Sequence, residues 1–288
     1  MEILTLKLAI KFFIYYGSWL VFPLLYLFFK KRWYWFVGLS FLFIYARFVE
    51  PQILLVNHYK IQTGFKAKYA LISDIHLGIY NNETILERTV EKINKLDVDA
   101  VLIAGDFTYD PQYDDMKKLF ASLSLIKVPV YAVLGNHDCQ HPGPDIRDEL
   151  KEILLSYNVH FLNNKALKLN GVTILGLGSN WANEDDVSLL KMYKKEDNVI
   201  VLTHNPDTVY GYEEGFNPDL TLAGHTHGGQ IRIPYIYKKI IPIHGEVIWD
   251  QGFYNYKNSK IFVTSGIGEV GLPLRFLIPP VIDVLELY

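Results

Sequence analysis

The sequence predicts a layered α/β fold in which mixed β-sheets are covered by helices, with an apolar segment ahead of it. From about residue 69 onward, apolar runs of strand length alternate with amphipathic segments, and helices come early whereas strands crowd later. The first fifty residues differ, because they contain an 18-residue run without charge from Phe12 to Phe29. The 288 residues suffice for one large domain and a small appendage, and a hydrophobic content of 50% exceeds what an ordinary core needs.

The apolar N-terminus, residues 1–50, is predicted to anchor the chain in a membrane as a transmembrane segment or hairpin of one or two apolar helices. The run Phe12–Phe29 approaches the minimum length for crossing a hydrocarbon core, and Lys30–Arg32 separates it from a shorter apolar run, Trp33–Ala46. A helical hairpin that turns at Lys30–Arg32 is the preferred arrangement. A cleaved signal peptide would end in a small-residue cleavage site, and a buried pair of soluble helices would carry a polar face.

Basic residues flank both sides of the predicted hairpin and bear on its orientation. The excess of lysine and arginine outside the turn favours a domain on the cytoplasmic face, whereas the compact triad in the turn favours the opposite orientation. The residues outside the turn are Lys7, Lys11, Arg47, Lys60, Lys66 and Lys68.

Apolar runs and helical periods divide the rest of the chain into elements. Residues 51–68 are predicted to be a linker or an edge strand, and residues 69–288 to be the main domain. The spacing of Ile85, Leu86, Val90 and Ile93 predicts a helix over 84–96, and further helices are predicted at 116–125 and, following Pro144, at 145–157. Short apolar runs predict strands at 69–73, 100–104, 130–134, 172–177, 199–202, 220–223, 261–264 and 281–287.

Most of the predicted strands end in a polar cluster, and five of the nine histidines lie in these clusters. The carboxyl ends of strands are where open α/β sheets place their chemistry, so we expect these side chains to converge. The clusters are Ser73-Asp74-Ile75-His76, Gly105-Asp106, Gly135-Asn136-His137-Asp138, Thr203-His204 and Gly224-His225-Thr226-His227.

The residue types in the clusters indicate a metal site. Imidazole, carboxylate and amide ligands without thiolate suit zinc, iron or manganese, and the single cysteine, Cys139, excludes both a thiolate site and an internal disulfide. Asp106 is the natural carboxylate to bridge two ions, while His225 and His227 can each reach one of two ions held ~3.5–4 Å apart. Each fragment alone is common by chance; a lone His204 is more often a hydrogen-bonded strand-end residue. All five clusters occur in this order, each one after an apolar run, and together they favour a two-metal site.

The ordered set resembles the calcineurin-like metallophosphoesterase superfamily, whose motifs D-x-H, G-D, G-N-H-[D/E], H and G-H-x-H are all intact between about Tyr69 and Tyr288. The resemblance implies a four-layer sandwich of two mixed β-sheets flanked by helices. It implies a first metal held by Asp74, His76 and His227, a second held by Asn136, His204 and His225, and Asp106 as the bridge. It also implies that His137 stabilises the transition state or protonates the leaving oxygen, oriented by Asp138.

Departures from the family pattern narrow the expected activity. The stretches 105–109 and 134–138 lack the phosphate-clamping arginines of the family's protein phosphatases. Tyr109 lies three residues after Asp106, so the tyrosine-ligated site of purple acid phosphatases is disfavoured but stays open as an alternative. The closing segments, Gly224–Pro234, Ser265–Gly268 and Pro273–Phe276, resemble a bacterial membrane-anchored subgroup. That subgroup includes broad phosphodiesterases and enzymes resembling the UDP-2,3-diacylglucosamine hydrolases of lipid A synthesis.

We therefore expect a dinuclear metal-dependent phosphoesterase that hydrolyses a phosphodiester or pyrophosphate bond at a membrane, with UDP-2,3-diacylglucosamine as a candidate substrate. The expected cofactors are two divalent ions, Mn²⁺ first and iron or zinc as alternatives. The expected location is a bacterial inner membrane with the catalytic domain on the cytoplasmic face. Substrates are expected to be lipid-linked or small, no protein partner is predicted, and the net charge of −3 disfavours nucleic acid. A broad-specificity phosphodiesterase or nuclease, and an inactive membrane-bound binding module, remain the alternatives.

Arg275 and residues 235–241 each allow two predictions. Arg275 either contacts a substrate phosphate or pairs with a carboxylate. Residues 235–241 form either a surface that meets lipid headgroups or acyl chains, or a strand pair with a lysine edge. His141 and His244 are weaker candidates for lining the cleft, and Cys139 is expected to be a packing residue.

Overall fold

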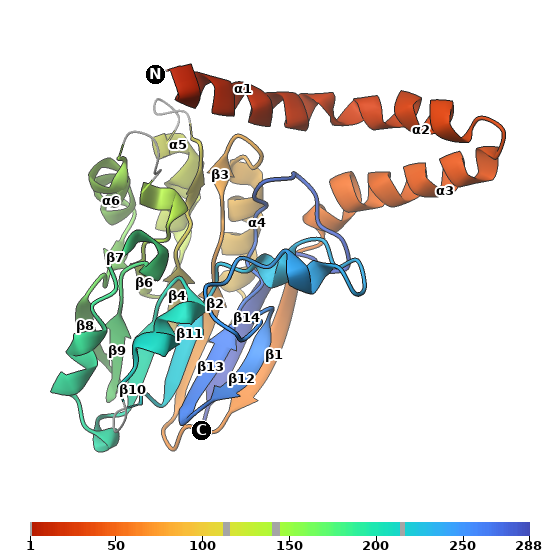
Figure 1. Cartoon of the computed structure of the whole chain (residues 1–288). Helices are drawn as coiled ribbons and strands as arrows, with labels where there is room; N and C mark the ends of the chain where they lie inside the picture. The colour runs from red at the N-terminus through yellow and green to blue at the C-terminus, as the bar shows by residue number, and fades with distance from the viewer. Residues whose placement is uncertain (1, 112–115, 140–144, 214–216) are drawn as a thin grey trace.

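Two six-stranded mixed β-sheets pack face to face, and a helical hairpin extends from them (Figure 1). This arrangement comes from a computed structural model that describes residues 2–111, 116–139, 145–213 and 217–288. The predicted α/β fold class with two mixed sheets is confirmed. The strand order is β1-β14-β2-β4-β6-β7 in the first sheet and β12-β13-β11-β10-β9-β8 in the second.

In the first sheet, only β14 and β2 pair antiparallel, and all other neighbours pair parallel. Helices α4 (Glu83–Ile93), α5 (Met116–Phe120) and α6 (Arg147–Ser156) accompany this sheet. Residues 51–68 were expected to be a linker or an edge strand. Within them, Leu55–Ile61 form β1, the edge strand of this sheet. The remaining strands are β2 (Ala67–Ile72), β4 (Ala100–Ala104), β6 (Val130–Val133), β7 (Val159–Phe161) and β14 (Val281–Leu287).

The second sheet is parallel at its centre and antiparallel at both edges. Two 3₁₀ helices, Val187–Met192 and Pro206–Gly211, lie beside its centre. Its strands are β8 (Lys165–Leu169), β9 (Val172–Gly176), β10 (Val199–Leu202), β11 (Leu220–Ala223), β12 (Gly252–Tyr256) and β13 (Ser259–Val263). A small parallel pair, β3 (Leu77–Gly78) and β5 (Thr108–Tyr109), lies beside the sheets.

The alternation of side chains in each central strand divides the apolar core into layers. In β2, Tyr69 and Leu71 pack between the two sheets, whereas Ala70 and Ile72 pack on the opposite face, with Leu86 of α4 in the same cluster. Both faces of these strands are therefore buried, which is why they are continuous apolar runs in the sequence. The packed sheets fix where the strands end, and the candidate site lies at those ends.

The N-terminal segment forms helices α1 (Glu2–Gly17), α2 (Val21–Phe29) and α3 (Trp33–Ile44), with the chain reversing between α2 and α3 (Figure 1). The stretch Leu8–Phe29 is long and apolar enough to cross a membrane, with a mean hydropathy of 1.7. Large apolar side chains along the hairpin are exposed, among them Phe28, at 84%. Exposed apolar surface of this extent is characteristic of a membrane or protein interaction site.

Both ends of the hairpin contact the domain. Near the start, the ring of Tyr15 stacks on Tyr80 with a centroid separation of 5.7 Å. Near the end, the buried carboxylate of Glu50 accepts hydrogen bonds from the backbone amides of Leu277 and Ile278. The hairpin is therefore joined to the domain at two places.

Candidate metal centre

The loops that follow four strands bring six of the seven predicted ligand residues into one buried cluster, and the loop after a fifth strand carries the seventh, Asn136. β2 and β4 lead to Asp74, His76 and Asp106, β6 leads to Asn136, and β10 and β11 lead to the three remaining histidines. Two groups of donor atoms result, and within each group the donor atoms lie within 4.8 Å of one another. The first group is Asp74, His76 and His227, and the second is Asp106, His204 and His225.

Five of these residues adopt the left-handed backbone region, which side chains other than glycine rarely enter. The φ angles are 52° at Asp74, 48° at His76, 55° at Asp106, 73° at His225 and 51° at His227. Such conformations cost about 1–3 kcal/mol each and cluster at functional sites, where the surrounding fold enforces them. Sequence reasoning missed this feature; the only signal for it is that Asp and His tolerate the region better than most residues.

Two glycines allow the loops to approach each other. A Cβ atom at Gly135 would lie 2.0 Å from Oδ1 of Asp106, and one at Gly224 would lie 2.5 Å from Oδ2 of Asp74. Real Cβ atoms never approach other atoms so closely, so only glycine fits at either position. The glycines beside the motifs thus make room for the two carboxylates.

In the first group, a backbone carbonyl fixes the orientation of one imidazole. Nδ1 of His76 donates to the carbonyl oxygen of Thr108 at 3.2 Å, so Nε2 of a neutral ring presents its lone pair to the cluster. That Nε2 lies 3.0 Å from Nε2 of His227, which lies 3.3 Å from Oδ1 of Asp74. Two imidazole nitrogens and a carboxylate oxygen therefore converge on one point.

The second group follows the same principle. Nδ1 of His204 donates to the carbonyl oxygen of Ala104 at 2.7 Å, and its Nε2 lies 3.2 Å from both Nδ1 of His225 and Oδ2 of Asp106. Oδ2 of Asp106 is also 3.5 Å from Nε2 of His76 in the first group. Asp106 therefore lies between the two groups, where a bridging carboxylate would lie.

Asn136 adds a further donor atom. Its carbonyl oxygen Oδ1 is buried and has no hydrogen-bond partner within the part of the chain that the structure describes. A buried oxygen without a partner is costly, and a metal ion would satisfy it. The donor set as a whole, imidazole, carboxylate and one amide, fits two divalent cations.

Burial and neighbouring charges set the protonation states in the cluster. Burial lowers the pKa of His76 to about 3 and also lowers the pKa of His225, so both rings are neutral. Burial opposes the ionisation of Asp74 and Asp106, but neighbouring histidines outweigh it and hold the pKa of each carboxyl below its usual value. Burial likewise opposes the charge on His204, but Asp106 and the other nearby carboxylate raise its pKa to about 9.

The predicted acid His137 lies at the edge of the cluster. Its ring is half-buried and contacts the rings of His76 and Tyr109 edge to face, at 5.1 Å and 5.2 Å between centroids. Its backbone amide donates to Oδ1 of Asp106 at 2.9 Å. The carboxylate of Asp106, which lies between the two ligand groups, therefore also fixes the backbone of His137.

The predicted role of Asp138 requires correction. Its buried carboxylate accepts hydrogen bonds from the backbone amides of Gly135, Phe107 and Thr108, at 2.9, 2.9 and 3.1 Å, and from the Thr108 hydroxyl at 3.1 Å. These bonds tie together the loops after β4 and β6. Asp138 thus positions the backbone that carries His137 instead of orienting the imidazole.

Arg275 mainly binds the backbone, while burial lowers its pKa to about 10 and the nearby carboxylate of Glu269 partly offsets that effect. The guanidinium is fully buried and donates to the backbone carbonyls of Ser265, Gly268 and Ile278, at distances from 2.7 to 3.2 Å. The loop that it holds also reaches the cluster, because the amide of Gly268 donates to the backbone carbonyl of Asp74 at 2.6 Å. Arg275 is therefore a framework residue behind the site.

The weaker candidates are placed as follows. His244 is exposed and stacks on Trp181 at 4.2 Å, and Trp181 packs edge-on against His225 at 4.4 Å. Sequence reasoning missed Trp181, which has no motif context. His141 lies outside the described residues. Burial raises the pKa of Cys139 to about 11, so it is a neutral thiol, as a packing residue would be.

Residues 235–241 do not form the strand pair that was one of the two predictions. Tyr237–Lys239 is a 3₁₀ turn, and Tyr235, Ile236 and Ile240 are exposed, Tyr235 by 95%. The segment is thus a loop with an exposed apolar surface.

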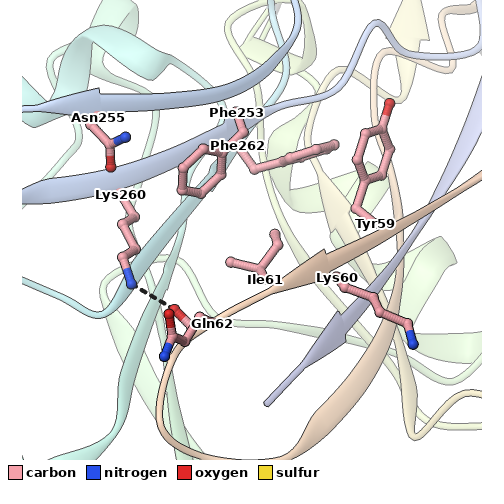
Figure 2. Close-up of a pocket in the computed structure, with 8 residues that line it drawn as sticks. All are labelled: Tyr59, Lys60, Ile61, Gln62, Phe253, Asn255, Lys260 and Phe262. Carbon is pink, nitrogen blue, oxygen red and sulfur yellow. Dashed lines mark hydrogen bonds between the residues drawn. The ribbon is translucent and has the colours of Figure 1, made fainter.

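An apolar pocket of about 270 Å³ lies directly beside the first ligand group. His227 forms part of its wall, and most of the rest is aliphatic, including Ile231, Ile240, Val270 and Leu272. Figure 2 shows a larger pocket of about 430 Å³, where Tyr59, Phe253 and Phe262 face one another between β1 and β12–β13. None of its lining residues belongs to the ligand groups, whereas the smaller pocket shares a residue with them.

Comparison with known proteins matches residues 67–229 to the family described as calcineurin-like phosphoesterase. An uncharacterized metallophosphoesterase of Helicobacter pylori is 29% identical over 84% of this chain, and the chain spans 65% of that relative's length. The uncharacterized metallophosphoesterase YkuE of Bacillus subtilis is 28% identical over 84% of this chain and 88% of its own length. The UDP-2,3-diacylglucosamine pyrophosphatase LpxG of Chlamydia muridarum is 25% identical over 84% of this chain and 92% of its own length.

Proposed function

Because this chain belongs to the calcineurin-like phosphoesterase family, we propose that its two ligand groups hold two divalent metal ions and that the centre hydrolyses a phosphate ester. Asp74, His76 and His227 would hold the first ion. Asn136, His204 and His225 would hold the second, and the carboxylate of Asp106 would be shared between the two. The observation that carries this proposal is the position of the Asp106 carboxylate, within 3.5 Å of a histidine from each group. Mn²⁺ is the proposed metal, with iron or zinc as alternatives.

The residues around the centre have separate tasks in the proposed reaction. When bound, the ions supply an acidified water and neutralise charge on the phosphoryl oxygens. The carbonyls of Thr108 and Ala104 hold two imidazoles in the tautomer that points Nε2 inward. His137, at the edge of the cluster, donates a proton to the leaving oxygen or stabilises charge that develops on the phosphoryl group. Asp138 keeps the loop of His137 in place.

We propose that the substrate is lipid-linked and carries a phosphodiester or pyrophosphate bond, with UDP-2,3-diacylglucosamine as the specific candidate. The apolar pocket beside His227 supports this, because an acyl chain fits an aliphatic wall that adjoins the reacting group. The exposed apolar loop around Ile236 and Ile240 supports it as well, as does the similarity to LpxG. Residues 1–50 anchor the protein in the membrane, and the domain lies on the cytoplasmic face.

The test of this proposal uses the full-length protein in detergent with Mn²⁺. Hydrolysis of UDP-2,3-diacylglucosamine is compared with hydrolysis of bis-p-nitrophenyl phosphate and of an oligonucleotide. A preference for the lipid supports the proposed substrate; activity on the simple diester alone indicates a broad phosphodiesterase, and activity on the oligonucleotide alone indicates a nuclease. No hydrolysis of any of the three refutes the proposed function.

Three substitutions test the roles of the residues. Asp106→Asn and His204→Ala should lose bound metal and turnover together, because they remove the bridge and a ligand. His137→Ala should keep both metals and lose about 10²- to 10⁴-fold in turnover, the usual contribution of a positioned acid. The exposed His58 of β1 provides the control, His58→Ala, which should behave as wild type. Normal turnover in His137→Ala would remove His137 from the mechanism.

A further inference from the structure

The N-terminal helix α1 places one charged residue against Tyr109, whose ring contacts that of the proposed metal ligand His76. Lys11 is only 9% exposed, and its ammonium group forms an ion pair with Asp110. The ammonium nitrogen also lies 3.8 Å from the centroid of the Tyr109 ring. In Figure 1, α1 passes across the domain above α5 and β3 and continues toward α2. The part of α1 that carries Lys11 therefore lies against the domain.

Tyr109 connects Lys11 to the reacting groups. Its ring contacts that of His137 at 5.2 Å and that of His76 at 5.6 Å between centroids, both edge to face. A single aromatic ring thus separates the ammonium group of Lys11 from the proposed acid and from a proposed metal ligand. Removing a lysine ammonium from water is costly, so its place here calls for a role.

We propose that Lys11 binds an anionic group of the substrate, adjacent to the phosphoryl group that the metal centre holds. This inference rests on the proposed phosphoesterase function and names the substrate class more narrowly, as one with a second negative charge, such as a pyrophosphate diester. An ammonium group has three N–H donors. Asp110 accepts from one and the face of Tyr109 attracts the cation, which leaves a donor for a phosphate oxygen.

Two motif loops of the chain offer no basic side chain of their own. Stretches 105–109 and 134–138 contain no arginine or lysine. Arg275 is committed to backbone carbonyls, and Arg232 pairs with Asp250 at 3.2 Å. Lys11 therefore supplies the positive charge from the N-terminal helix instead of from the motif loops.

A purely structural role for Lys11 makes a different prediction. If the ion pair only docks α1, then Lys11→Met and Asp110→Asn remove the same contact and should have the same effect. If Lys11 binds substrate, the two variants should differ in activity. Asp110→Asn keeps the ammonium group and removes the carboxylate that competes with the substrate for it. The stack of Tyr15 on Tyr80 remains in both variants and holds α1 against the domain.

The experiment measures kcat/KM of the full-length protein in detergent with Mn²⁺ for two substrates. UDP-2,3-diacylglucosamine carries a second charged phosphoryl group, and bis-p-nitrophenyl phosphate does not. Lys11→Met should lose about 10- to 100-fold on the pyrophosphate, the usual loss for a charge-assisted hydrogen bond, and little on the diester. Asp110→Asn should keep or increase activity on the pyrophosphate. Lys31→Met, in the exposed turn of the hairpin, is the control and should change neither value.

Three results would overturn the inference. The first is an equal loss on both substrates in Lys11→Met, and the second is the same loss in Asp110→Asn as in Lys11→Met. The third is a wild-type protein that cleaves the simple diester but no pyrophosphate, in which case the phosphoesterase function stands and the inference alone fails. If the wild-type protein cleaves neither substrate, the proposed function fails first. Metal content and melting temperature, measured for each variant, confirm that it is folded.

Discussion

Replacing Gly135 by alanine tests how closely the proposed bridging carboxylate is fitted to its loop. The Cβ atom would lie 2.0 Å from Oδ1 and 2.5 Å from the backbone nitrogen of Asp106, whereas ordinary contacts are 3.4–4 Å. The neighbouring atoms are backbone and a buried carboxylate, so neither can turn away into solvent. The carboxylate or the loop must therefore shift by about 1 Å, the scale on which catalytic geometry is lost.

The expected loss follows from that displacement. A misplacement of about 1 Å costs on the order of 10²-fold in turnover. Disturbing a group that supports metal ligands costs about 10- to 100-fold in metal affinity. Because the backbone of Gly135 does not need positive φ, the effect is steric, and overpacking should lower the free energy of unfolding by about 1–3 kcal/mol. Gly135→Ala should thus remain folded while losing activity and metal.

The assay measures kcat/KM and the number of metal ions per chain at a fixed free Mn²⁺ concentration. Gly38→Ala is the matched control, because a Cβ at Gly38 of α3 meets no atom within 4 Å. Wild-type kcat/KM with two bound metals in Gly135→Ala would refute the reasoning, since the fit between Gly135 and Asp106 would then have no functional weight.

Three further predictions concern stability. Burial raises the pKa of Asp283 from 3.8 to about 6, so the contribution of this carboxyl to stability is full below pH 3.8 and is lost as the pH rises through 6. Asp283→Asn should therefore increase the free energy of unfolding at pH 8 by up to about 3 kcal/mol, and raise the melting temperature there, but should change neither at pH 3.5. An equal shift at both pH values would contradict this. Arg275→Met leaves three buried carbonyls without donors and should cost about 3 kcal/mol or more in chemical denaturation; an unchanged midpoint would refute the framework role. Removal of metal by a chelator should lower the melting temperature, and Mn²⁺ at 100 times its Kd should restore about 2.7 kcal/mol; a melting temperature indifferent to Mn²⁺ would count against the metal centre.

The sequence predicted the strands that are buried on both faces and missed those that are not. β4, β10 and β11 were predicted at their observed bounds because each is a short, fully buried apolar run. β8 and β12 were missed because they are edge strands in which every residue is exposed or only partly buried. An edge strand gains its stability from one neighbour and one face, which leaves little apolar signal in its own sequence.

The candidate site was predicted better than its surroundings. The motifs identified the residues that cluster because chemistry at strand ends depends on residue type and order, both visible in the sequence. The roles of Asp138 and Arg275 could not be predicted, because they depend on which backbone groups lie within hydrogen-bonding distance. Trp181 and Lys11 were missed as neighbours of the site because contacts between distant segments follow from the packed fold alone.

The attachment of the hairpin decides where the chain can be cut to obtain a soluble protein. Glu50 satisfies two backbone amides of the loop that Arg275 holds, and the amide of Arg275 donates to the carbonyl of Ala46 at 2.9 Å. A truncation after residue 50, the predicted end of the anchor, would remove Ala46 and Glu50 and loosen a loop whose Gly268 amide donates to the carbonyl of Asp74. A soluble fragment suited to crystallisation should therefore begin before Ala46, with the exposed apolar residues of α3 replaced by polar ones.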